Sequence, residues 1–431
     1  MNCIPSFKVA ALLTGAFLAA ACGTQVSDPD APTEPLRYRA SYTVTPDIAN
    51  GTANVTLRIS QSRALLREMT FRVDERLSDI EADGDFVIEQ GRGHWNPPEN
   101  GGSLSWTVTV PHRRNGDGYD AWLGADFGLF RAEDVIPRAT TRTLKGAQSE
   151  SWLRFDLPGN WSVVTQYFDD NGRMRVDYPT RRFDQPTGWI VMGDLGVRRE
   201  RIAGIRIAVA GPVDHAVRRM DTLAMLNWTL PELGRLLPEL PPRLTIVSAG
   251  DPMWRGGLSA PQSLFLHAER PLISENATST LLHELMHMTL GIRGRDGYDW
   301  IVEGLAEYYS LQLLYRSGTI SEERFAAAQA DLADWATQAE TLCGPSSSGA
   351  TTALAVGLFA ALDKEIRSAS NAEASLDDAV RELVNINDRI DARGLADIVE
   401  QLTGAKPDTL HSGNLPGCRT IASGESGNQA Q

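Results

Sequence analysis

Two histidines stand four residues apart in an apolar segment of the chain, in the pentapeptide His283-Glu284-Leu285-Met286-His287. Leucine and methionine surround them, and Gly291 follows at a position where a helix would end, so the pattern predicts a helix. Residues i and i+4 of a helix lie on one face, which directs both imidazoles the same way. Any fold of this chain must therefore accommodate a largely apolar helix that carries two histidines on one face.

A carboxylate follows in the next apolar segment, residues 300–309 (W-I-V-E-G-L-A-E-Y-Y), which is also predicted to be helical. Zinc commonly takes two imidazole nitrogens and one carboxylate from a protein and leaves a fourth position for water. We therefore predict that His283, His287 and Glu303 bind a single Zn²⁺ ion.

Two further glutamates have predicted roles. Glu284, next to the first histidine, is the expected general base that takes the proton of the water. Glu307 stands one helical turn after Glu303 and is expected to accept the free N–H of a ligand histidine. The alternative is a buried helix with two satisfied histidines and two solvated glutamates.

These residues resemble the gluzincin metallopeptidases. They are most similar to the glycyl aminopeptidase family, with the leucotriene-hydrolase-like aminopeptidases as relatives. Residues 300–309 resemble the family's glutamate helix, and Gly256-Gly257-Leu258-Ser259 resembles its substrate strand, G-G-x-E. The resemblance covers about residues 150–405 and implies a zinc peptidase that acts on peptides or proteins.

The chain departs from the family pattern in two places. Ser259 stands where the family's strand carries the glutamate that binds a substrate amino terminus, so cleavage at chain ends versus internal sites stays open. Residues 341–365 contain no tyrosine, although the family offers a tyrosine hydroxyl to the oxyanion from this region. Losing one oxyanion donor costs on the order of 100- to 1000-fold in rate. A catalytically reduced protein that binds peptides or acts in surface assembly is therefore the alternative. The substitutes for the missing hydroxyl are Tyr298, Tyr308, Tyr309 or Arg293.

The first 22 residues are predicted to be a lipoprotein-type export signal. Residues 9–21 are apolar but too short for a membrane span. The stretch Leu18-Ala19-Ala20-Ala21-Cys22 is similar to a bacterial lipoprotein box, with its leucine one position early. Cys22 is then the lipidated amino terminus, and ordinary signal cleavage that leaves Cys22 unmodified is the alternative. Residues 23–36 form the expected flexible tether, so we predict an exported, membrane-anchored protein that faces the periplasm or the cell exterior.

Composition adds two expectations. In an oxidising compartment Cys343 and Cys418 are expected to form a disulfide, and two free thiols are the alternative. The net charge of −14 argues against nucleic-acid binding, which usually needs a basic patch, and against electrostatic docking on anionic lipid. Membrane contact is thus expected through the lipid anchor only.

The expected fold class is multidomain α+β. Period-two alternation, as in Tyr38, Ala40, Tyr42 and Val44, predicts a mainly β, sandwich-like domain over 37–210, with an aromatic loop at 112–134. A gluzincin (thermolysin-like) catalytic domain is expected over 211–405, with Gly256 to His267 as its edge strand. A partly disordered tail is expected over 406–431. The helices predicted for the carboxy-terminal part cover about residues 300–316, 321–341, 351–367, 375–385 and 392–403.

Overall fold

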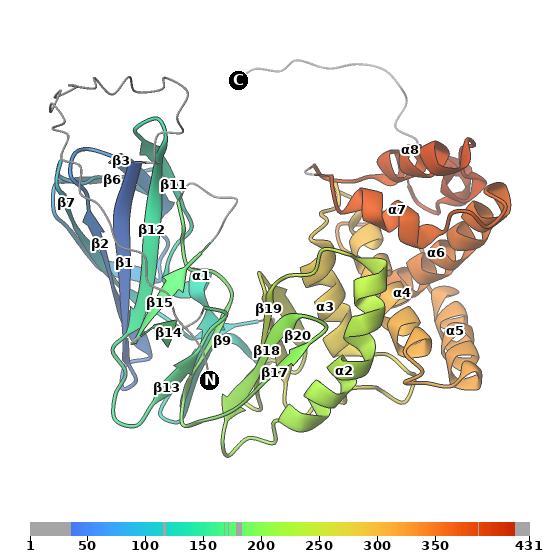
Figure 1. Cartoon of the computed structure of the whole chain (residues 1–431), viewed down its shortest axis with the longest axis horizontal. Coiled ribbons are helices and arrows are strands. Elements are labelled where there is room, and N and C mark those ends of the chain that lie inside the picture. The colour runs from blue at the N-terminus through green and yellow to red at the C-terminus, as the bar shows by residue number, and fades with distance from the viewer. Residues whose placement is uncertain are drawn as a thin grey trace, which may run out of the picture.

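The computed structural model describes residues 36–114, 118–167, 169–170, 172–177, 183–386 and 388–418. The predicted signal, Cys22, the tether up to residue 35 and the tail from residue 419 lie outside the described residues. None of the helices in the described ranges is long and apolar enough to span a bilayer. The described chain forms two halves that lie side by side, one of β-strands and one of a smaller sheet with helices (Figure 1).

The amino-terminal half contains β1 (Leu36–Asp47), β2 (Thr52–Ser60), β3 (Leu66–Arg72), β4 (Leu77–Ala82), β5 (Asp85–Glu89), β6 (Arg92–Asn96), β7 (Gly101–Thr109), β8 (His112–Arg113), β9 (Tyr119–Leu123), β10 (Phe127–Arg131), α1 (Ala132–Val135), β11 (Ala139–Thr143), β12 (Ala147–Phe155), β13 (Ser162–Val164), β14 (Asp169–Asp170), β15 (Arg173–Val176) and β16 (Trp189–Gly193). The strand order is β14-β15-β12-β1-β2-β7-β4 in one sheet, β11-β3-β6-β5 in the second and β13-β16-β10-β9-β8 in the third. β1 pairs in parallel with β12 and antiparallel with β2.

One apolar core joins these three sheets. Along β1 the side chains of Tyr38, Ala40, Tyr42 and Val44 are buried, as their alternation predicted. They share this core with residues of the other two sheets, such as Trp95. Together with the helices of the second half, these sheets give the mixed α+β class that the sequence predicts.

The prediction of an aromatic loop at 112–134 is wrong. The segment contains β8, β9, β10 and the short helix α1. Phe130 of β10 lies in the core of the amino-terminal half, whereas Phe127 and Leu129 lie in a second core beyond the strand. A strand that is buried on both faces shows no period-two alternation, which is why its sequence does not indicate a strand.

The second half begins with a five-stranded sheet of order β17-β18-β19-β21-β20. Its strands are β17 (Leu195–Ile202), β18 (Ile205–Pro212), β19 (Arg243–Ala249), β20 (Gly257–Ala260) and β21 (Ser263–His267). The predicted boundary between residues 210 and 211 therefore falls inside this sheet, and Asp194 alone separates β16 from β17. No linker-like segment marks the junction, because the two strands follow each other almost directly along the chain.

The helices of this half are α2 (Arg219–Leu236), α3 (Thr280–Leu290), α4 (Asp299–Arg316), α5 (Glu322–Ala336), α6 (Ala350–Ala369), α7 (Leu376–Leu383) and α8 (Ala392–Thr403), followed by the 3₁₀ turns η1 (Asp408–Leu410) and η2 (Ser412–Asn414). The helices and one face of the sheet enclose a single large apolar core. The part of the predicted tail up to Cys418 is folded, because its turns pack back onto α6 and α8.

A separate core joins the two halves. It contains Phe127, Leu129 and Trp189 from the amino-terminal half, and Val247 and Phe265 from the five-stranded sheet. The five-stranded sheet is thus covered by helices on one face and by the amino-terminal half on the other.

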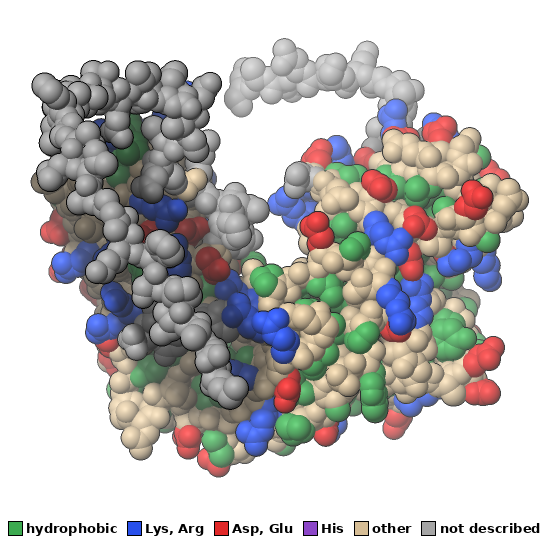
Figure 2. Space-filling view, viewed as in Figure 1, with side chains coloured by type: hydrophobic (Ala, Val, Ile, Leu, Met, Phe, Trp, Pro, Cys, Tyr) green, Lys and Arg blue, Asp and Glu red, His purple; other side chains and the backbone are tan. Residues whose placement is uncertain are grey.

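Acidic and basic side chains are scattered over the visible face of both halves (Figure 2).

Candidate metal centre

Helix α3 carries both histidines on the face that is turned away from its core side. The helix begins after Ser279, whose side-chain oxygen accepts a hydrogen bond from the backbone N–H of Leu282 at 3.3 Å. It ends at Gly291, whose φ of 60° suits glycine. His283 and His287 are partly exposed, whereas the residues on the other face are buried, namely Leu281, Leu282, Leu285 and Met286.

Helix α4 brings Glu303 and Glu307 toward these histidines. A Cβ atom on the neighbouring Gly304 would lie 2.5 Å from Cβ of Ala355 and 2.9 Å from the ring of Phe359, both on α6. The glycine therefore allows α4 to approach α6 more closely than any other residue would. This approach sets the position from which Glu303 reaches α3.

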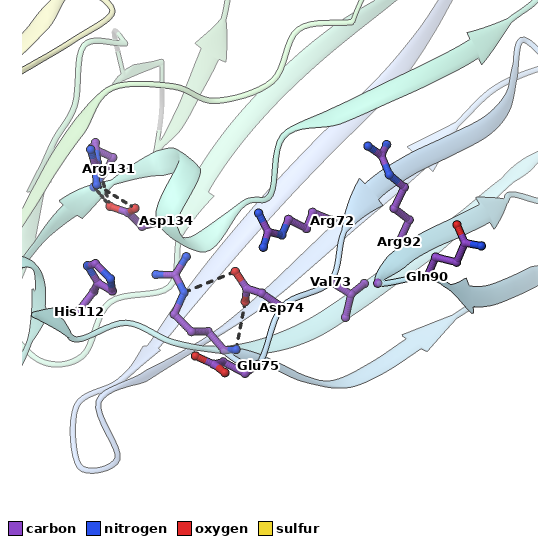
Figure 3. Close-up of a pocket in the computed structure, with 11 residues that line it drawn as sticks. Arg72, Val73, Asp74, Glu75, Gln90, Arg92, His112, Arg131 and Asp134 are labelled. Carbon is purple, nitrogen blue, oxygen red and sulfur yellow. Dashed lines mark hydrogen bonds and ion pairs between the residues drawn. The ribbon is translucent and has the colours of Figure 1, made fainter. Parts of the chain in front are cut away.

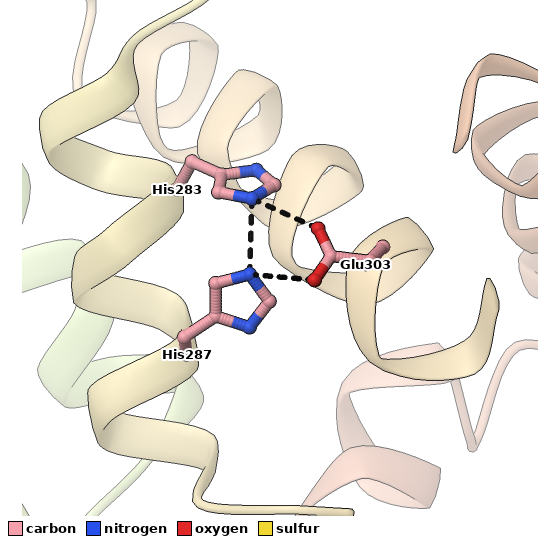
Figure 4. A group of neighbouring side chains, drawn as sticks. All are labelled: His283, His287 and Glu303. Atoms are coloured by element: carbon pink, nitrogen blue, oxygen red, sulfur yellow. Dashed lines mark hydrogen bonds and ion pairs between the residues drawn. The ribbon is translucent and has the colours of Figure 1, made fainter. Parts of the chain in front are cut away.

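The side chains of His283, His287 and Glu303 converge (Figure 4). One potential ligand atom from each lies within 4.8 Å of the other two. The Nε2 atoms of the two histidines are 3.0 Å apart, and the carboxylate oxygens of Glu303 lie 3.2 Å from Nε2 of His283 and 3.4 Å from Nε2 of His287. Two nitrogens and one carboxylate thus face a single point. These three groups form the donor set of a catalytic zinc site.

Glu307 holds the ring of His283 from the other side. Its Oε2 lies 2.9 Å from Nδ1 of His283, so an N–H at Nδ1 donates to the carboxylate and Nε2 is left to face the group. Burial disfavours the charged form of His283, but hydrogen bonds to Glu303 and Glu307 outweigh it and raise the pKa of His283 to about 10. Burial likewise opposes the charge on Glu303, but hydrogen bonds from both histidines lower its pKa to about 2.

The side chain of Glu284 extends from α3 toward the edge strand β20. A Cβ atom on Gly257 would stand 2.6 Å from Cγ2 of Thr280 and 2.9 Å from Cγ of Glu284. Only a glycine lets β20 pass this close to the helix. The sequence pattern had indicated the strand, but not its contact with Glu284.

β20 is an edge strand with free backbone groups. It pairs with β21, and the backbone N–H of His267 donates to the carbonyl of Gly256 at 2.9 Å. Because hydrogen-bonded pairs alternate along an antiparallel ladder, the backbone groups of Gly257 and Ser259 point to the open edge. The indole of Trp189 donates to the carbonyl of Leu258 at 3.0 Å and ties the strand to the amino-terminal half.

A cavity of about 330 Å³ opens beside the three converging side chains. His283, Glu303 and Glu307 line one wall, and Ser347, Ser348 and Thr352 supply hydroxyls to another. Trp335, 47% exposed, also lines the cavity. The sequence did not indicate this wall, because it combines the end of α5 with the loop before α6.

The tyrosines considered as substitutes for the missing hydroxyl do not line this cavity. Tyr309 is fully buried and its hydroxyl donates to Asp377 at 3.0 Å, away from the histidines. Tyr308 is also buried. Among the described residues, the hydroxyls in the cavity wall belong to serine and threonine.

Cys343 and Cys418 are joined by a disulfide, with their Cα atoms 4.8 Å apart. The backbone N–H of Leu342 donates to the carbonyl of Pro416 at 2.8 Å beside it. The end of the folded chain is therefore attached to the loop that leads into the cavity wall. His267 lies in the sheet with its Nε2 3.6 Å from Asp251, outside the converging group.

A larger cavity, of about 900 Å³, lies in the amino-terminal half (Figure 3). Its charges are partly paired within its own wall. Arg131 bonds to Asp134 at 3.3 Å, and Arg76 lies 3.8 Å from Asp74. None of its described lining residues belongs to the group on α3 and α4, so this cavity is separate from the candidate centre.

No protein-family model matches the sequence, and no curated protein matches it. Solved structures do. An aminopeptidase N family protein from Idiomarina loihiensis superposes with a TM-score of 0.58, at 18% identity over 80% of this chain and 70% of that one. The chain has the fold of the M1 zinc metallopeptidases.

Two further structures with this fold match most of the chain. An M1 zinc metallopeptidase from Deinococcus radiodurans has a TM-score of 0.53, at 16% identity over 86% of this chain and 91% of that one. Yeast LTA4 hydrolase in complex with bestatin has a TM-score of 0.56, at 15% identity over 90% of this chain and 68% of that one. The resemblance to the gluzincin and leucotriene-hydrolase-like peptidases is thus confirmed at the level of fold.

Proposed function

We propose that the protein is a zinc-dependent peptidase that uses one Zn²⁺ ion. The observation that carries the proposal is the convergence of His283, His287 and Glu303 on one point, within the fold of the M1 zinc metallopeptidases. The donor set fits zinc, since two imidazole Nε2 atoms and a carboxylate face one another. Glu307 orients one of these rings through its Nδ1 atom, as carboxylates beside metal-binding histidines commonly do.

Peptide hydrolysis follows from these groups. When bound, zinc would supply Lewis-acid chemistry that makes water a better nucleophile and a peptide carbonyl a better electrophile. Glu284 takes the proton of the attacking water and then donates it to the leaving amine as the C–N bond breaks. Its place between α3 and β20 supports this role, because a substrate that pairs with β20 runs past its carboxylate.

The open edge of β20 supports an extended peptide as the substrate. Free backbone groups at Gly257 and Ser259 can pair with a peptide as an added strand. A catalytically reduced protein that binds peptides is the second candidate. Ser259 in place of an acidic residue, and a cavity wall whose described hydroxyls are all serine or threonine, favour it.

Replacement of Glu284 by glutamine tests the mechanism. The Glu284→Gln protein should bind one equivalent of zinc like the wild type and lose hydrolysis of a peptide library, because glutamine cannot accept the proton. A wild-type protein that binds zinc and peptides without cleaving them would support the second candidate. Unchanged cleavage by Glu284→Gln would refute the assignment of the base.

We further propose that the protein is exported and anchored by lipid at Cys22, which the sequence pattern of residues 18–22 supports. Incorporation of radiolabelled palmitate into the wild-type chain, and its loss in Cys22→Ser, is the expected result. Label that persists in the Cys22→Ser chain would contradict it.

A further inference from the structure

A second large cavity, of about 780 Å³, lies between the two halves of the molecule. β13 and the residues that follow it form one wall, and β17, β18 and β19 form the other. Figure 1 shows β13 and β17 on the two sides of this junction. The volume lies in the range of small-molecule sites, which occur preferentially between domains.

The wall formed by the sheet changes character along its length. Near one end, Val197, Ala210 and Val247 pack in the core that joins the two halves. Further along, the same face carries arginines. Because side chains alternate between faces, Arg199 and Arg201 lie on the face of Val197, and the register places Arg201 opposite Arg206.

The arginines continue across the sheet. Arg206 stands opposite Arg243 on the next strand, so arginines at three neighbouring register positions lie on one face of β17, β18 and β19. All three line the cavity, as does Arg199. Like charges directly opposite each other in a sheet are destabilising. Asp177 pairs with Arg243, and Glu200 also lines the cavity, so an anion would add to a compensation that is already partly present. The chain as a whole has a net charge of −14, so this concentration of positive charge is local.

One of these arginines is part of the built wall. Arg243 is 6% exposed, pairs with Asp177, and lies with its guanidinium 5.4 Å from the centre of the Tyr167 ring. Arg201 donates to the carbonyl of Gly204 at 3.3 Å. A planar guanidinium group can donate two parallel hydrogen bonds to a pair of oxygens of a carboxylate or phosphate group.

The opposite wall is mixed. The apolar side chains of Leu157, Val163, Val164 and Met174 line part of it, and Ser162, Thr165, Gln166 and Tyr167 line the rest. A ligand with negatively charged oxygens toward the arginines and hydrocarbon toward these apolar side chains would therefore match both walls.

We propose that this cavity binds an anionic amphiphile, with its phosphate or carboxylate head on Arg199, Arg201 and Arg206 and its apolar tail against Val163 and Met174. The site is distinct from the candidate metal centre, since none of its described lining residues belongs to that group. It does not depend on peptidase activity.

Isothermal titration of the purified chain in detergent-free buffer tests the proposal. The probes are decyl phosphate and decanoate below their micelle concentrations, inorganic phosphate, and the uncharged decyl maltoside. Decyl phosphate or decanoate should bind at one site per chain. Inorganic phosphate and decyl maltoside should each bind at least tenfold more weakly than the better of the two, because each lacks one half of the required chemistry. The better of the two head groups identifies the natural one.

Two variants with a matched control locate the site. The double variant Arg199→Ala/Arg201→Ala should weaken binding at least tenfold. The control Arg198→Ala, to be compared with the single variant Arg199→Ala, removes one arginine from the same strand but on the opposite face, and should change binding less than twofold. Ala208→Trp keeps every charge and fills the cavity with an indole, so it should also abolish binding. Thermal melting curves check that each variant is folded.

Four results would overturn the proposal. They are no binding of either amphiphile at 1 mM, equal effects of the control and the double variant, inorganic phosphate that binds as tightly as decyl phosphate, and decyl maltoside that binds as tightly as the charged probes. If the double variant does not fold, Ala208→Trp and Arg199→Ala carry the test alone.

Discussion

Zinc binding should release protons, because the metal-free site holds His283 as an imidazolium ion. Its pKa of about 10 lies well above pH 7, so the metal-free sites carry this proton at pH 7. A zinc ligand must be deprotonated, and the ion therefore competes with the proton. Each unit of pH below 10 should weaken the apparent zinc affinity about tenfold, which gives a rise of about 100-fold between pH 7 and pH 9.

The assay is calorimetric titration of the metal-free protein with zinc, against a competing chelator, in two buffers of different ionisation enthalpy. The difference between the buffers counts the protons released. Glu307→Gln removes one of the two carboxylates that hold the imidazolium, so it should lower the pKa of His283 and flatten the pH dependence. Glu382→Gln, an exposed position on α7, should leave the pH dependence unchanged. A wild-type affinity that changes less than about tenfold between pH 7 and pH 9 would refute this account of the electrostatics.

Two other variants test parts of the site. Gly257→Ala places a Cβ atom 2.6 Å from Thr280 and 2.9 Å from Glu284, so it should displace the side chain of Glu284. We expect kcat for peptide cleavage to fall at least tenfold while the zinc content stays the same. An unchanged kcat would show that this contact does not position Glu284. Cys343→Ser removes the disulfide between two residues that are 75 apart in sequence, so the loop-entropy relation predicts a loss of about 4 kcal/mol in the free energy of unfolding. Denaturant titration under non-reducing conditions measures this loss. A loss below about 1 kcal/mol would contradict the prediction.

The helical part of the fold could be predicted because its signals are local. The spacing of His283 and His287 places them on one face of any helix, and α4, α6 and α8 lie within two residues of their predicted bounds. α5 ends at Ala336 rather than 341, and the chain leaves the helix there before it reaches the disulfide at Cys343. Glu303 could be predicted as the carboxylate of the next helix, but its distance from the histidines could not, since nothing local relates α4 to α3.

The rest depends on tertiary contacts that a sequence pattern does not encode. β10 is buried on both faces and so lacks the alternation by which strands are recognised. The contact of Gly257 with Glu284 exists only because β20 crosses α3. The arginines of β17 have the exposed, charged pattern of an ordinary solvated strand, and only the register with β18 and β19 brings them together.

The central claim is that His283, His287 and Glu303 hold one zinc ion. Its most direct test is the zinc content of the purified chain. Inductively coupled plasma mass spectrometry measures it after dialysis against a buffer with limiting free zinc. The account predicts one zinc per wild-type chain and less than about a tenth of that in His287→Ala, since removing one of three protein ligands opens the site. A wild-type chain without zinc, or a His287→Ala chain that retains it in full, would contradict the account.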